Sequence, residues 1–183
     1  MHFIDEKPFA PYFIFIKGIN EMNDKDVLEL LDLGKGNLVE TTEAEDGEYL
    51  DDENCTYIYK CRNWVHIMDS WFYSLYHSQK LRSRIEELGK SYEIFTCSVG
   101  DSDRSFDFRY FKNGEKVREY IVDSPNYNDQ IVRIDFGSAL SSEKEALQKK
   151  DESDTVLHIA ESLGVQLPKS AEGIKCYKLE GLD

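Results

Sequence analysis

The polar residues best placed for chemistry lie in the segment Asp101-Ser102-Asp103-Arg104-Ser105-Phe106-Asp107. Asp101 and Asp103 have the residue type and the spacing to bind a divalent cation, or to form a turn between two strands. Because Gly-Asp-Ser-Asp is a typical turn sequence, we favour the turn.

Arg109 and Arg118 flank Asn113-Gly114, a dipeptide that strongly indicates a β-hairpin. A two-residue turn pairs residue 112 with residue 115, and it therefore places Arg109 opposite Arg118. Two like charges in this position are unfavourable unless an anion or a carboxylate lies between them. The spacing predicts an anion-binding site at these two arginines. The alternative is an array that is solvated or paired internally with Asp107 and Glu119.

The four histidines are scattered, at His2, His66, His77 and His158. His66 shares its side of a strand-like run with large apolar residues, which favours a packed histidine over a ligand. His158 lies at the boundary of a predicted helix, and we do not place it in a site. His77 follows an aromatic run and precedes a basic helix, so it is the best lone candidate for acid–base chemistry.

Sequence motifs of common enzymes are absent from the chain. It contains no GxGxxG, no GxxxxGK[ST], no HExxH and no GxSxG. We therefore predict no catalytic residue, no metal site and no cofactor.

Acidic residues are concentrated between Glu40 and Glu53, where no basic residue interrupts them. With 22 Lys and Arg against 36 Asp and Glu, the chain has a formal net charge of −14. The run predicts a docking surface for a basic protein, where charge speeds association and sets specificity. A solvated loop and a calcium site are the alternatives, although the run lacks EF-hand spacing. The residues predicted to bind the partner are Glu43, Glu45, Asp46, Glu48, Asp51, Asp52 and Glu53.

Charge and composition also exclude several classes of protein. Nucleic acids and anionic membranes need clustered Lys and Arg, so we expect neither as a partner. No apolar run approaches the roughly 20 residues of a membrane span, and the N-terminus does not resemble a signal peptide. The four cysteines match neither a zinc site nor a redox motif, and reduced, partly buried thiols indicate the cytoplasm. Aromatic residues make up 13% of the chain, which argues against disorder.

Residue patterns predict a single α+β domain over residues 1–183, with a largely antiparallel sheet flanked by about three helices. An acidic loop is expected at about 40–53, a turn at 123–126 and a C-terminal tail at about 168–183. The segment 69–77 is ambiguous between strand and helix. Strands are expected over 9–16, 37–43, 55–61, 64–68, 92–99, 105–111, 116–122 and 131–136, and helices over 24–33, 79–88, 143–150 and 154–163.

The stretch SFDFRYFKNGEKVREYIVDSP, followed by IVRIDFGSAL and DESDTVLHIAESLGV, resembles a group of small uncharacterised bacterial proteins described as domains of unknown function. The resemblance covers about residues 90–167. These proteins in turn resemble the small acidic immunity-type proteins that accompany bacterial toxins. The resemblance implies a binding role and brings no catalytic residues.

We therefore expect a bacterial, cytoplasmic and non-enzymatic protein-binding module, immunity-like or antitoxin-like, that neutralises a basic partner such as a nuclease. Aromatic side chains would anchor the interface, with core packing as their alternative role: Tyr49, Tyr57, Tyr59, Trp71 and Tyr73. A second hypothesis is a small-ligand or anion-binding protein, or an enzyme, with a site on the sheet face. Its candidate residues are His77, Asp101, Asp103, Arg109 and Arg118. A third is a structural or regulatory subunit of a larger assembly.

Overall fold

The computed structural model describes residue 4 and residues 9–39, 54–70, 74–100, 102–126 and 129–180. Within these ranges the chain forms nine strands and five helices, and three of the helices have seven residues or more. The predicted α+β class is confirmed. The elements are β1 (Phe9–Lys17), α1 (Asp24–Leu30), β2 (Gly36–Val39), β3 (Cys55–Cys61), β4 (Trp64–Ser70), α2 (Ser74–His77), α3 (Gln79–Leu88), β5 (Ile94–Val99), β6 (Phe106–Lys112), β7 (Glu115–Asn126), β8 (Asp129–Gly137), α4 (Glu143–Ala146), α5 (Glu152–Ser162) and β9 (Lys175–Leu179).

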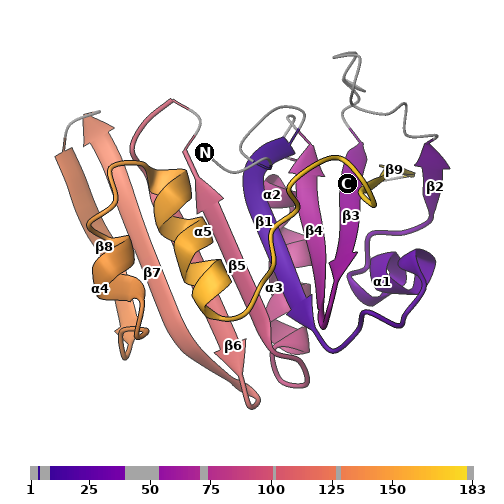
Figure 1. The fold of residues 1–183 in the computed structure, drawn as a ribbon, viewed down its shortest axis with the longest axis horizontal. Helices are drawn as coiled ribbons and strands as arrows, with labels where there is room; N and C mark the ends of the chain where they lie inside the picture. Colours follow the sequence, from indigo (N-terminus) through magenta and orange to yellow (C-terminus); the bar gives the residue numbers. More distant parts are fainter. Residues whose placement is uncertain are drawn as a thin grey trace.

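The nine strands form one antiparallel sheet in the order β2-β9-β3-β4-β1-β5-β6-β7-β8 (Figure 1). Strand β1 lies in the middle of this order, and its side chains from Tyr12 to Ile16 are all buried. A continuous apolar run suits such a strand, because both faces of the sheet are covered there.

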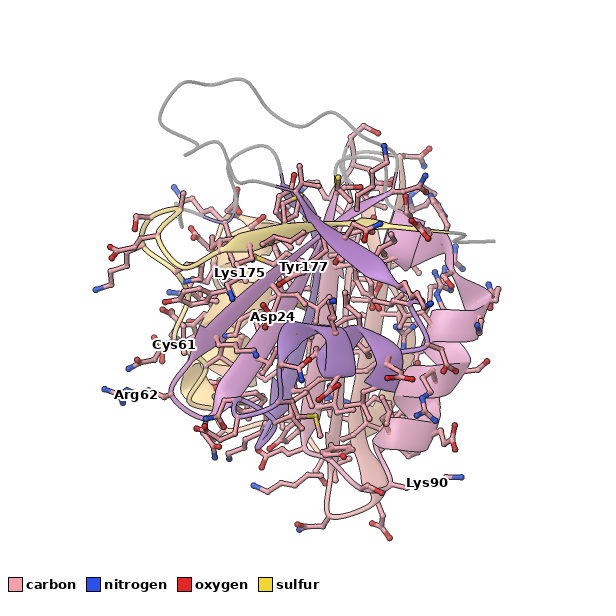
Figure 2. All side chains as sticks on the ribbon, turned by 90° about the vertical axis from the view of Figure 1, so that its right-hand side faces the viewer. Asp24, Cys61, Arg62, Lys90, Lys175 and Tyr177 are labelled. Carbon is pink, nitrogen blue, oxygen red and sulfur yellow. The ribbon has the colours of Figure 1, made fainter. Side chains whose placement is uncertain are left out.

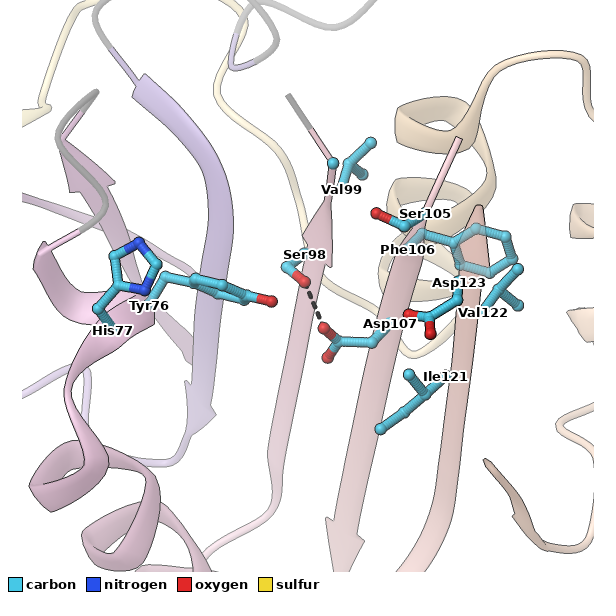
Figure 3. A pocket seen from close by; sticks show the side chains of 11 residues that line it. Tyr76, His77, Ser98, Val99, Ser105, Phe106, Asp107, Ile121, Val122 and Asp123 are labelled. Carbon is cyan, nitrogen blue, oxygen red and sulfur yellow. Dashed lines mark hydrogen bonds between the residues drawn. The ribbon is translucent and has the colours of Figure 1, made fainter. Parts of the chain in front are cut away.

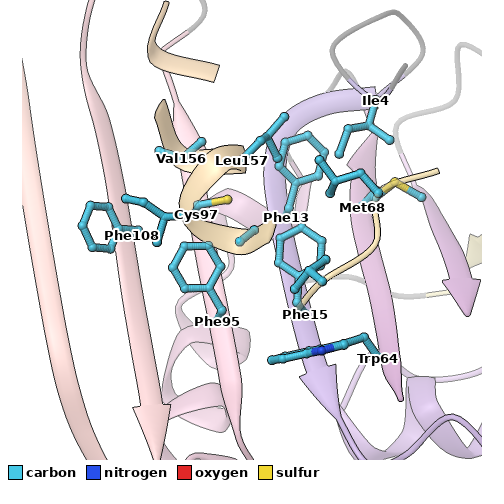
Figure 4. Close-up of a cluster of buried hydrophobic side chains, with 14 of the residues drawn as sticks. Ile4, Phe13, Phe15, Trp64, Met68, Phe95, Cys97, Phe108, Val156 and Leu157 are labelled. Atoms are coloured by element: carbon cyan, nitrogen blue, oxygen red, sulfur yellow. The ribbon is translucent and has the colours of Figure 1, made fainter. Parts of the chain in front are cut away.

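Helices cover the two faces of the sheet, and each face has its own apolar core (Figure 1). On the face covered by α5, Phe13 and Phe15 pack with Phe95 and with Val156 and Leu157 of the helix (Figure 4). On the opposite face, covered by α1, α2 and α3, the core is mainly aliphatic and includes Ile14, Ile16, Leu81 and Ile85. We call these the α5 face and the α3 face.

The C-terminal tail predicted at 168–183 is wrong for residues 175–179. These residues form β9, which lies between β2 and β3 in the interior of the sheet. Cys176, Tyr177 and Leu179 are buried there. The segment is short and its pairing partners lie far away in the sequence, so no local pattern marks it as a strand.

A buried carboxylate ties β9 to the first helix. Asp24, at the start of α1, accepts hydrogen bonds from Lys175 Nζ at 3.0 Å and from the Tyr177 hydroxyl at 2.5 Å, both on β9 (Figure 2). Lys60 Nζ of β3 lies 2.6 Å from the same carboxylate. Burial alone would raise the pKa of Asp24, but the hydrogen bonds from Lys60, Tyr177 and Lys175 outweigh it and hold the pKa below its ordinary value.

The turn predicted at 123–126 is also wrong, because β7 continues to Asn126. The β7–β8 register is irregular between Asp123 and Asn126. Pro125 lies in this interval and has no N–H group to donate to the neighbouring strand, so it fits where the pairing is irregular. The ambiguous segment 69–77 divides between the end of β4 and the short helix α2. The acidic residues 40–53 lie outside the described ranges.

Two further expectations concern cysteines and membranes. Cys55, Cys97 and Cys176 are buried, Cys61 is partly exposed, and none of the four forms a disulfide. No helix in the described ranges is long and apolar enough to cross a membrane.

Replacing Asp24 with Asn should lower the free energy of unfolding by about 2 kcal/mol, because two lysines and a tyrosine lose an ionised acceptor. The loss should shrink as the pH falls through the depressed pKa of Asp24, since the wild-type carboxylate then becomes neutral as well. Urea unfolding at several pH values measures both effects. Glu29→Gln, an exposed charge removal on the same helix, is the control and should change stability by less than about 0.5 kcal/mol.

Candidate functional site

A cavity of about 240 Å³ lies where β5 ends and β6 begins, between α2 and β7. Figure 3 shows Tyr76 and His77 of α2 on one side, Ser98 and Asp107 at the centre, and Asp123 of β7 on the far side. We call it the Asp107 pocket.

Strand pairing places the central side chains in one row on the α3 face. Tyr12 pairs with Ser98, Ser98 with Asp107, Asp107 with Ile121, and Ile121 with Ile134. Paired residues of antiparallel strands point to the same side of a sheet. The row therefore changes from polar to apolar between β6 and β8.

Asp107 is only 8% exposed. The Ser98 hydroxyl donates a hydrogen bond to its Oδ2, and Arg109 Nη1 lies 3.1 Å from its Oδ1. Burial raises the pKa of Asp107, and the nearby Arg109 guanidinium and the Ser98 hydroxyl offset this only in part. The pocket therefore contains a buried carboxylate whose arginine partner is shared with a second carboxylate, Glu119.

A second buried carboxylate, Asp69 of β4, positions the short helix α2. It accepts hydrogen bonds from the backbone N–H groups of Leu75 at 3.1 Å and Tyr76 at 2.9 Å. Burial raises the pKa of Asp69 to about 6, although these bonds favour the charged form. The same bonds hold Tyr76 and His77 at the pocket, and the Tyr76 hydroxyl points toward Ser98 (Figure 3).

The predicted pairing of Arg109 with Arg118 is wrong. Asn113 and Gly114 form the expected turn, with φ of 55° and 83°, and Lys112 pairs with Glu115. The register then shifts between Tyr110 and Phe111, because Val117 is an extra residue on β7. Arg109 consequently pairs with Glu119, and Arg118 projects from the α5 face. An anion site between the two arginines has no common face on which to form.

Each arginine is bonded to carboxylates instead. The internally paired alternative, with Asp107 and Glu119 as partners, is confirmed for Arg109 but not for Arg118. Arg109 Nε donates to Glu119 at 2.8 Å. Arg118 is only 2% exposed, donates through Nε to Glu143 of α4 at 2.9 Å, and lies 2.6 Å from Asp135 of β8. Arg118 therefore fastens α4 and β8 to the sheet.

The α3 face has an uncovered apolar surface over β7 and β8. Ile131, Ile134 and Phe136 of β8 are 38–50% exposed, and Ile121 of β7 is partly exposed. Ile131, Ile134 and Phe136 pair with Asp123, Ile121 and Glu119 of β7, respectively, and this pairing places them on the α3 face. We call Ile121, Ile131, Ile134 and Phe136 the open face. Ile121 belongs to both the open face and the Asp107 pocket, so the two surfaces are continuous.

The remaining predicted site residues lie in different parts of the chain. Asp103 accepts hydrogen bonds from the Ser105 N–H at 2.7 Å and the Ser105 hydroxyl at 2.5 Å, which confirms the turn for this residue. Asp101 and His2 lie outside the described ranges. His77 lines the Asp107 pocket and is exposed. His158 of α5 lies 3.7 Å from Glu145 Oε1.

The prediction that His66 is a packed residue is confirmed. Its ring lies between Phe15 and Tyr59, with centroids at 4.9 and 5.1 Å. Neither ring nitrogen has a hydrogen-bond partner within the described part of the chain. Burial lowers the pKa of His66 to about 3.

Sequence reasoning missed Ser98, Asp107 and the open face as parts of one site. The sequence predicted strands over 92–99 and 105–111 and counted Asp107 among the polar residues, but strand order was needed to bring Ser98 and Asp107 together. Among the described residues, no three His, Cys, Asp or Glu side chains group as a metal site. Carboxylates, a hydroxyl and aromatic rings are groups that bind a cation or a hydrogen-bond donor.

His66 should make the fold sensitive to acid. The unfolded state binds a proton near the ordinary histidine pKa whereas the folded state does not, so stability falls as the pH drops below about 6.5, by up to about 1.4 kcal/mol per pH unit. Urea unfolding of His66→Phe and wild type at about pH 7.5 and about pH 5 measures this. Between these two pH values, the free energy of unfolding of the wild type should fall by about 2 kcal/mol more than that of the variant. Equal losses would contradict the assignment.

Comparisons of the chain with models of protein families, with curated proteins and with solved structures gave no match. The function therefore has to be inferred from the geometry of the chain's own surfaces.

Proposed function

We propose that this chain is a non-enzymatic protein-binding module, and that a basic partner protein docks on the open face of β7 and β8. The single observation that carries the proposal is the row of apolar side chains at Ile121, Ile131, Ile134 and Phe136. Contiguous apolar surface of this kind on a soluble chain is typical of interaction sites.

The position of β8 also suits a docking strand. It is the last strand of the described sheet, and all nine of its residues are exposed. An edge strand offers backbone N–H and C=O groups to an added strand, while alternate side chains give specificity. Arg133 and Asp135 place charges along this edge, which disfavours pairing with unselected chains.

Charge supports a basic partner. The net charge of −14 would attract a basic protein over long range and speed its association. The acidic run from Glu40 to Glu53 lies outside the described residues, and we propose it as a second, electrostatic contact. This combination fits an immunity-like or antitoxin-like role in the bacterial cytoplasm.

Of the described candidate residues of the small-ligand or enzyme hypothesis, His77 lines the Asp107 pocket, together with the carboxylates Asp107 and Asp123. The pocket's volume of about 240 Å³ is below the roughly 300–1,000 Å³ typical of small-molecule sites. The assembly-subunit hypothesis fits the open face equally well, but it predicts a permanent complex that salt does not dissociate. We favour a reversible protein contact.

The open face is tested by the double variant Ile134→Thr, Phe136→Thr, which removes apolar surface and keeps strand-forming residues. A basic partner isolated from the source cell's lysate with the wild-type chain should bind the variant at least about tenfold more weakly. Isothermal titration calorimetry with the purified partner gives the affinity.

The matched control is Leu38→Thr, on the other edge strand, where the leucine is 58% exposed. It should bind the partner as the wild type does. Equal affinity of wild type and the double variant would contradict docking on the open face, whatever the partner is.

The acidic run has its own test. Replacing Glu45, Asp46, Asp51 and Asp52 with Ser should slow association with the basic partner and flatten its dependence on salt, with a smaller change in the dissociation rate. Stopped-flow or surface-plasmon measurements at low and moderate salt record both rates. Unchanged association in low salt would exclude this run as a docking surface.

A further inference from the structure

We infer that the Asp107 pocket receives one cationic side chain, lysine or arginine, from the protein that docks on the open face. This inference rests on the proposed function and names the chemistry of the partner at one position. It assigns the pocket a protein side chain rather than a free metabolite.

The charged side chains that line the pocket select for a cation. Asp107 of β6 and Asp123 of β7 are both carboxylates, and His77 of α2 lines the opposite side of the pocket (Figure 3). Asp107 is buried, with one oxygen bonded to Ser98 and the other near Arg109. Because Asp107 is buried and shares Arg109 with Glu119, its charged form would gain from another cation, in keeping with the raised pKa of this carboxyl.

The cations already near the pocket are shared with other groups or weakly held. Arg109 donates through Nη1 to Asp107 at 3.1 Å and through Nε to Glu119 at 2.8 Å, so one guanidinium serves two carboxylates. Arg82 donates to the Tyr76 carbonyl oxygen at 2.8 Å and lies over the Tyr76 ring. Asp123 is paired with Arg133 at 2.7 Å, but both side chains are about half exposed. Exposed pairs of this kind contribute little, so Asp123 can exchange Arg133 for a cation of the partner.

The size and position of the pocket favour a side chain of a docked protein. A volume of about 240 Å³ suits one long side chain better than a nucleotide or an organic cofactor. Ile121 lies between Asp107 and Ile134 in the same cross-strand row. A chain that covers Ile134 and Phe136 is therefore one strand away from the pocket, within reach of a lysine or arginine side chain.

The first experiment uses no unidentified partner. The wild-type chain, labelled with ¹⁵N, is titrated by NMR with the blocked amino acid N-acetyl-arginine methylamide. The matched probe is N-acetyl-citrulline methylamide, which has the same shape without the charge. We expect the arginine probe to shift the amide signals of Ser98, Asp107 and Asp123 in a saturable manner, and the citrulline probe to leave them unchanged.

Two variants remove one carboxylate each. Asp123→Asn is the safer change, because this side chain is half exposed, and Asp107→Asn tests the buried group. Each should weaken binding of the arginine probe by about tenfold, as expected for one charge-assisted hydrogen bond. Asp129→Asn, an exposed carboxylate on β8 outside the pocket, is the control and should change nothing. Equal response to both probes, or no response at these signals, overturns the inference.

A second arm separates this inference from the proposed function. With the purified partner, Asp123→Asn should weaken binding by about tenfold while Asp129→Asn does not. If Ile134→Thr, Phe136→Thr weakens the partner but Asp123→Asn does not, docking on the open face stands and the pocket inference is wrong. If the arginine probe binds but Asp123→Asn leaves the affinity for the partner unchanged, the pocket binds a free cationic ligand, and the inference is again wrong.

Discussion

The width of the β-sheet is the constraint on which the rest of the structure depends. Nine strands about 4.8 Å apart span roughly 38 Å, whereas one helix covers about 10 Å. Full cover would need about four helices on each face, but the described chain places three on one face and two on the other. On the α3 face, α2 and α3 lie over the middle of the sheet, and α1 lies toward β3, β9 and β2. The strands beyond them, β7 and β8, keep exposed apolar residues.

This distribution also explains the chemistry of the candidate site. At the border between covered and uncovered sheet, side chains are buried enough to be desolvated yet close to solvent. Asp107 has this environment: its burial raises its pKa, while Ser98 and Arg109 limit the cost of that burial. Arg118, on the opposite face, fastens α4 and β8 through Glu143 and Asp135. Strand β8 is thus held in place from the α5 face, while its α3 face has no helix above it in the described part of the chain.

Several parts of the fold were predictable because their signals are local. Asn113-Gly114 forms the hairpin turn, Asn23 caps α1, and the apolar run of β1 is a central strand. Predictions failed where distant segments decide the outcome. The extra residue Val117 moved Arg118 to the other face, and β9 is a strand because β2 and β3 accept it on both sides. A bulge or a long-range strand pairing changes the free energy of its own short segment very little. The residue pattern of that segment therefore does not reveal it.

The fold class, the acidity of the chain, the packed state of His66 and the turn at Asp103 could be predicted from the sequence, because each depends on composition, alternation or neighbouring residues. Which side chains meet depends on the tertiary structure. Ser98, Asp107 and Asp123 come from three strands, and His77 comes from a helix that Asp69 holds through backbone hydrogen bonds. Likewise, the apolar residues of β8 resemble core residues in the sequence. Strand order places them at the edge of a sheet that is wider than its helices can cover.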